Sequence, residues 1–160
     1  MARQPQKINT IIQSFKDYAL GDIKHNTDNP IAAFILAMCF LDQLAYFRYF
    51  LTKRKIDRTN TFISKYMPEY GQLKLYTLTR NSLVHNYSSD GKFDIDHRGN
   101  ENVPYAEKNG IVYINTKVFT RYLEKGFEDV VKDFKVIGSD AYENALKASV
   151  KYPVLVDTYK

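Results

Sequence analysis

The segment from Gln72 to about Tyr87 carries charged and ionisable residues among apolar residues at helical spacing. Its apolar residues share one face of a helical wheel at about 100° per residue; they are Leu73, Tyr76, Leu83, Val84 and Tyr87. Arg80 falls in the middle of this face. An unpaired charge there would cost several kcal/mol, so the pattern predicts that Arg80 has an ionic partner or reaches solvent.

Asp42 is the candidate partner of Arg80. It is the first charged residue after an uncharged apolar run at 31–41, and we expect it to be partly buried on a long helix. An ion pair between Asp42 and Arg80 would join two central helices, and breaking it would cost about 3–5 kcal/mol if it is buried.

Asn81 and His85 are four residues apart and therefore share a second flank of the same helix. A histidine titrates near neutral pH, which suits it to proton transfer. An arginine and a histidine together supply positive charge and an acid–base group.

The run Arg80-Asn81-Ser82-Leu83-Val84-His85 resembles the R-x-x-x-x-H signature of the HEPN superfamily, in which a polar residue often follows the arginine. The resemblance implies a helical bundle in which the motif lies late in a core helix and a polar or acidic residue lies on an earlier long helix. Asp42 matches that earlier position. Many HEPN proteins are endoribonucleases that need no metal and act as dimers.

The resemblance assigns a role to each residue of the predicted catalytic site. His85 would transfer protons, Arg80 would bind phosphate, Asn81 would orient the reacting groups and Asp42 would hold Arg80. The products would carry a 2′,3′-cyclic phosphate. Arg80 and His85 lie about 140° apart on an ideal helix, so a homodimer that combines the motifs of two copies would form such a site more easily.

Two other functions remain open from the sequence. One is a HEPN-like module that binds RNA or a nucleotide, or pairs with an antitoxin protein, without cleaving anything. The other is a structural homodimer in which Arg80 and Asp42 only fix helix packing. The endoribonuclease hypothesis would suit a toxin, phage-defence or stress-response system.

Two further groups of residues are candidates for RNA binding. The basic connector could bind phosphates; it contains Lys53, Arg54, Lys55 and Arg58. Its cations would equally suit the negative end of the preceding helix dipole. Asn86 and Tyr87 lie beside the motif, where they could contact RNA or simply end the helix.

No metal site or cofactor is expected. Asp94, Asp96 and His97 resemble ligands of a hard metal ion, but strand alternation places both aspartates on a solvent face. The sequence contains no P-loop, Gly-rich dinucleotide fingerprint, H-E-x-x-H or G-x-S-x-G motif.

The elements that position these residues are mostly helical. Periodicity and caps predict helices at 8–24, 30–52, 59–67, 72–87, about 116–134 and 140–152. Alternation at 93–96 and an Asn109-Gly110 turn predict a small β-hairpin insertion at about 92–114. We therefore expect a bundle of five or six helices in one domain over 1–160.

Composition is consistent with a cytoplasmic protein. The 160 residues include 44% hydrophobic and 26% charged residues, with a net charge of +5 that favours anionic partners. The uncharged run at 31–41 is shorter than the roughly 20 residues of a membrane span, and the N-terminal residues lack a signal-peptide core. The single cysteine, Cys39, is expected to be buried.

Overall fold

The computed structural model describes residues 4–79, 91–95 and 101–156 of the chain. Helices dominate these residues, and a small three-stranded sheet lies between the fifth and sixth α-helices in chain order. The expected mostly helical fold with a small β insertion is therefore confirmed.

The first helical stretch is nearly continuous. It comprises α1 (Ile8–Ser14), a π-helical segment η1 (Phe15–Leu20) and α2 (Gly21–His25). The next helix, α3 (Pro30–Arg48), begins as predicted, since the Asn29 side chain accepts a hydrogen bond from the Ala32 N–H at 3.2 Å and Pro30 occupies the first turn.

The boundary between α3 and α4 differs from the prediction. Helix α3 ends at Arg48, and α4 (Lys55–Tyr66) begins inside the stretch that we expected to be a connector. Tertiary contacts explain the early end of α3, because the Asn144 side chain donates a hydrogen bond to the Arg48 carbonyl at 3.1 Å. The cations of this stretch therefore lie at the start of α4, where Asp57 offsets their repulsion from the helix dipole.

After α4 come a short 3₁₀ turn (Pro68–Tyr70) and α5 (Leu75–Thr79). The predicted helix at 72–87 thus begins at Leu75, and its part beyond residue 79 lies outside the described residues.

The sheet contains the predicted hairpin and one further strand. Strands β2 (Tyr105–Lys108) and β3 (Ile111–Ile114) are antiparallel, and β1 (Phe93–Ile95) pairs with β3 in parallel, giving the order β1-β3-β2. Asn109 and Gly110 have φ values of +53° and +75°, as a type I′ turn requires.

The last two helices are α6 (Thr116–Phe134) and α7 (Asp140–Lys151). Each has the cap that the sequence predicts: Asn115 accepts from the Val118 N–H and Ser139 accepts from the Tyr142 N–H, both at 3.2 Å. Gly138, between them, has a φ of +80°.

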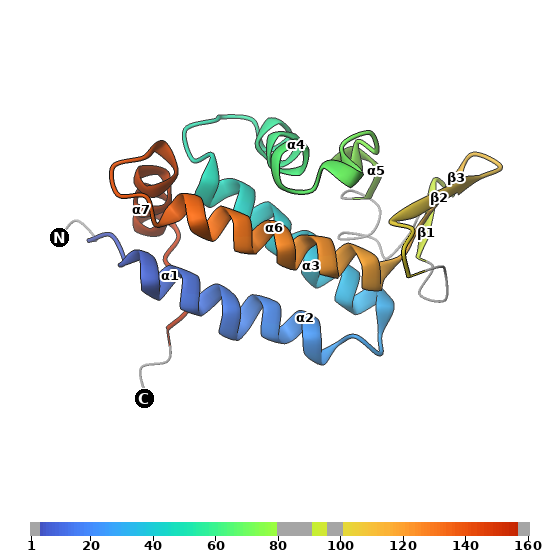
Figure 1. The fold of residues 1–160 in the computed structure, drawn as a ribbon, viewed down its shortest axis with the longest axis horizontal. Helices are drawn as coiled ribbons and strands as arrows, with labels where there is room; N and C mark the ends of the chain where they lie inside the picture. The colour runs from blue at the N-terminus through green and yellow to red at the C-terminus, as the bar shows by residue number, and fades with distance from the viewer. Residues whose placement is uncertain (1–3, 80–90, 96–100, 157–160) are drawn as a thin grey trace.

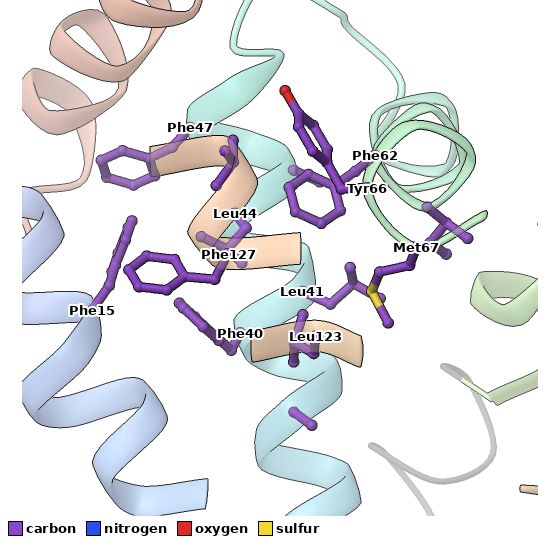
Figure 2. Packing of buried hydrophobic residues seen from close by; sticks show 14 of the residues in the cluster. Phe15, Phe40, Leu41, Leu44, Phe47, Phe62, Tyr66, Met67, Leu123 and Phe127 are labelled. Atoms are coloured by element: carbon purple, nitrogen blue, oxygen red, sulfur yellow. The ribbon is translucent and has the colours of Figure 1, made fainter. Parts of the chain in front are cut away.

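Helices α3 and α6 form the centre of the bundle (Figure 1). Helices α1 and α2 flank them on one side, α4 and α5 on the other, α7 lies at one end and the sheet at the opposite end. The core between α3, α6 and the first helical stretch is aromatic, with the rings of Phe15, Phe40, Phe47 and Phe127 gathered together (Figure 2). All four side chains are buried.

Two properties of α3 were not expected from the sequence: the exposure of Cys39 and the length over which the helix is apolar. Cys39 is exposed, not buried, because it lies on the side of α3 that no neighbouring helix covers completely. Among the described helices, α3 is also long and apolar enough to be considered a membrane span by length and composition alone. Half of the residues in that window are buried inside the protein.

The contact between α6 and the end of α4 predicts opposite effects of alanine at two helical glycines. A Cβ atom at Gly126 would lie 3.0 Å from the Tyr66 carbonyl oxygen, whereas one at Gly21 would have its nearest contact at 3.7 Å. Gly126→Ala should lower the free energy of unfolding by about 1–3 kcal/mol through overpacking. Gly21→Ala should raise it by about 0.5–1 kcal/mol.

Urea denaturation of both variants measures these changes, with the wild-type chain as the reference. Stabilisation by Gly126→Ala would show that α6 and α4 approach each other less closely than described.

Candidate functional site

Most of the predicted catalytic site, including the whole motif from Arg80 to His85, lies outside the described residues. This holds for Arg80, Asn81 and His85, and for the neighbouring RNA-binding candidates Asn86 and Tyr87. The expected Asp42–Arg80 ion pair therefore stays a prediction. Helix α5 leads directly to the motif and is anchored by the buried Leu75 and Thr79.

Asp42 lies on α3 and is held by two residues of α4. The Lys55 ammonium is 2.6 Å from Asp42 Oδ2, and the Thr59 hydroxyl donates to Asp42 Oδ1 at 3.0 Å. The Asp42 side chain is 18% exposed, while that of Lys55 is 37% exposed. Asp42 is therefore partly buried and paired, and a negative charge on one side of α3 remains accessible to solvent.

The Asp42–Lys55 contact joins two parts of the predicted site. Asp42 was predicted as a catalytic residue, and Lys55 as an RNA-binding residue of the basic stretch. They are far enough apart in sequence that only the packing of α4 on α3 brings them together. Cys39 precedes Asp42 by three residues on α3. Its partial burial has the larger effect in raising the pKa of the thiol, and the negative charge of Asp42 has the smaller.

The other residues of the basic stretch have different surroundings. Arg54 forms a two-point ion pair with Asp57, with N–O distances of 2.8 and 2.7 Å. Arg58 donates to the carbonyl of Thr52 at 2.7 Å, and its guanidinium lies 4.9 Å from the centroid of the Tyr46 ring. Lys53 is exposed. Two of the four cations, Arg54 and Arg58, thus also stabilise the turn into α4.

A second polar cluster, which sequence analysis missed, connects α3, α4 and α6. The Tyr66 hydroxyl donates to Asp133 at 2.5 Å and accepts a hydrogen bond from Arg48 Nε at 2.8 Å. Lys65 lies 2.7 Å from the same carboxylate oxygen of Asp133. Figure 2 shows the Tyr66 ring packed near Phe62 with its oxygen directed away from the apolar side chains.

This second cluster borders a surface pocket of about 370 Å³ that also reaches Ser139 and Asp140. Burial, and then the hydrogen bond to Asp133, raise the pKa of Tyr66, so its hydroxyl stays protonated. Among the described lining residues, Arg48 and Lys65 are opposed by Asp133 and Asp140, so their charges balance and offer no excess to attract an ion. These groups are positioned to hold three helices together.

One sequence signal pointed to this cluster. Arg48 directly follows the apolar residues 44–47 on its helix, so its charge, like that of Arg80 on an apolar face, required a partner. Tyr66 and Asp133 gave no comparable signal, because they are far apart in the sequence and no periodic pattern relates them.

The described residues contain no group of three histidine, cysteine, aspartate or glutamate side chains that could hold a metal ion. Asp94 is exposed on β1, as strand alternation predicts, while Asp96 and His97 lie outside the described residues.

Comparison with models of protein families, with curated proteins and with solved structures finds no match to this chain. The assignment of function therefore depends on the residues themselves.

The second cluster predicts a specific acid sensitivity. Burial alone would raise the pKa of Asp133, but hydrogen bonds from Lys65 and Tyr66 and the charge of Arg48 outweigh it and lower the pKa. Because the folded-state pKa is the lower one, Asp133 stabilises the fold above the unfolded pKa of about 3.9. This stabilisation is lost as pH falls through the folded-state pKa.

Urea unfolding of the wild type and Asp133→Asn across the acidic range measures this effect. The stability advantage of the wild type should be largest near neutral pH and should shrink as the pH falls below about 4. Two parallel pH profiles would contradict the assigned role of Asp133.

Proposed function

We propose that this chain is a metal-independent endoribonuclease of the HEPN type whose site combines Asp42 with Arg80, Asn81 and His85. The observation that carries the proposal is the contact between Asp42 and Lys55, which places a predicted catalytic residue beside a predicted RNA-binding cation. The spacing of Arg80 and His85 in the sequence and the mostly helical fold support it.

The proposed reaction is an internal transfer of the phosphate. His85 accepts the proton of the ribose 2′-hydroxyl, and the 2′-oxygen then bonds to the adjacent phosphorus. The bond from phosphorus to the 5′-oxygen of the next nucleotide breaks, and this oxygen takes up a proton from the protonated imidazole of His85, in the same copy or in the second copy of the dimer. The products are a 2′,3′-cyclic phosphate and a 5′-hydroxyl end, and no water or oxidant is consumed.

The remaining residues assist this reaction. Arg80 stabilises the negative charge that accumulates on the phosphate oxygens in the transition state. Asn81 orients the reacting groups. Asp42 is assigned to the positioning of Arg80, and its contacts with Lys55 and Thr59 fix the carboxylate in one place.

A homodimer is part of the proposal. Arg80 and His85 lie about 140° apart on an ideal helix. An arginine and a histidine therefore face one cleft more easily when two copies of the chain contribute to it. A role in a toxin, phage-defence or stress system, in the cytoplasm, would fit an RNA-cleaving domain of this kind.

Cleavage of a labelled mixed-sequence RNA in excess EDTA tests the proposal. The wild type should cleave, whereas His85→Ala and Arg80→Ala should each lower the rate by at least about 100-fold, as expected for loss of a proton-transfer or charge-stabilising group. Circular dichroism verifies that both variants fold.

Matched controls separate the motif from general effects. His25 lies on α2, where its ring Nδ1 is 2.8 Å from the Gly21 carbonyl oxygen, and Arg121 is exposed on α6. His25→Ala and Arg121→Ala should cleave at the wild-type rate. Binding of RNA without cleavage by the wild type would instead favour the alternative, a non-catalytic RNA- or nucleotide-binding module or an antitoxin-paired subunit.

A further inference from the structure

A cluster of aromatic rings lies where α3 ends and α7 ends. The Tyr46 ring contacts the rings of Phe50 and Tyr152 edge-on, with centroid distances of 5.4 Å in both cases. We call these three residues the aromatic platform. Tyr152 is 57% exposed, and the neighbouring Leu51 is 69% exposed, so a large apolar surface faces solvent here.

Cations surround the aromatic platform. The Arg58 guanidinium lies 4.9 Å from the Tyr46 centroid, and the Lys151 ammonium lies 5.5 Å from the Tyr152 centroid. The exposed Lys53 is beside Arg58, which donates to its carbonyl. None of these three cations forms an ion pair with a carboxylate of the described residues.

Two acidic residues of α3 and α4 near this basic stretch are paired with other cations. Asp57 is bonded to Arg54, and Asp42 is bonded to Lys55. The described part of this surface therefore combines one exposed ring, that of Tyr152, and two half-buried rings with an excess of positive charge. This combination is what single-stranded nucleic acid requires, because bases stack on rings and phosphates pair with lysine and arginine.

From these observations we propose that the aromatic platform binds single-stranded RNA, with one base stacked on Tyr152 and the flanking phosphates held by Lys53, Arg58 and Lys151. The inference rests on the proposed function and deepens it. The basic start of α4 links the platform to Asp42, since Arg58 contacts Tyr46 while Lys55 contacts Asp42. RNA bound to the platform would thus continue toward the proposed catalytic site.

The chain has no tryptophan, so Tyr152→Trp creates a single fluorescent reporter. The probe is a short 2′-O-methyl oligouridine, which lacks the attacking hydroxyl and is not cleaved. Titration should quench the emission of the introduced indole saturably, and added salt should reverse the quenching. Val103→Trp, before β2 at the opposite end of the molecule from α7, should show no saturable quenching (Figure 1).

Substitutions then identify the source of the affinity, measured with a labelled form of the same probe. Tyr152→Phe keeps the ring and should bind as the wild type does. Tyr152→Leu keeps an apolar side chain without a π-face and should bind about tenfold more weakly. Lys151→Ala should weaken binding and reduce the salt dependence, whereas Lys108→Ala on β2 should do neither.

Each outcome separates the platform from the catalytic proposal. Saturable quenching in the Tyr152→Trp variant without any RNA cleavage by the wild type would support the platform and reject the endoribonuclease. Cleavage by the wild type with no quenching in that variant would reject the platform alone. A blue shift of the variant's emission with protein concentration, in the absence of RNA, would show that a second copy of the chain covers this surface and would overturn the inference.

Discussion

Burial of α3 is the constraint on which the rest of the structure depends. Helices α2, α4, α6 and α7 all pack on α3, and side chains such as Phe34, Leu41 and Leu44 are completely buried. A helix surrounded in this way leaves few places for charge. Asp42 and Arg48 lie on α3, and each requires partners from another helix because an isolated buried charge is unstable.

These partners determine how α4 and α6 lie on α3. Lys55 and Thr59 of α4 hold Asp42, while Tyr66 of α4 and Asp133 of α6 hold Arg48. Both clusters therefore fix α4 on α3, but they differ in character. The Arg48 cluster balances its charges internally. The Asp42 cluster continues into a basic surface that includes the exposed ring of Tyr152, which is why we propose a function for the latter.

The sequence predicted features whose causes are local. The caps Asn29, Asn115 and Ser139 and the Asn109-Gly110 turn act within a few residues, so the starts of these three helices and the hairpin were predictable. Features with long-range causes were not. The end of α3 depends on Asn144, and the pairing of Asp42 with Lys55 depends on helix packing. The exposure of Cys39 was missed because the run at 31–41 is apolar on every side and gives no sign of which side faces solvent.

The most direct test of the account is a parallel measurement of RNA cleavage and unfolding free energy in Asp42→Asn. The amide keeps an acceptor for Thr59 and removes the charge that faces Lys55. A solvent-accessible ion pair contributes only about 0.2–1 kcal/mol, so the free energy of unfolding should fall by no more than this. The account predicts that the cleavage rate nevertheless falls by at least about tenfold, as expected when a positioning group is lost. An unchanged cleavage rate, with or without a loss of stability, would show that Asp42 only fixes helix packing.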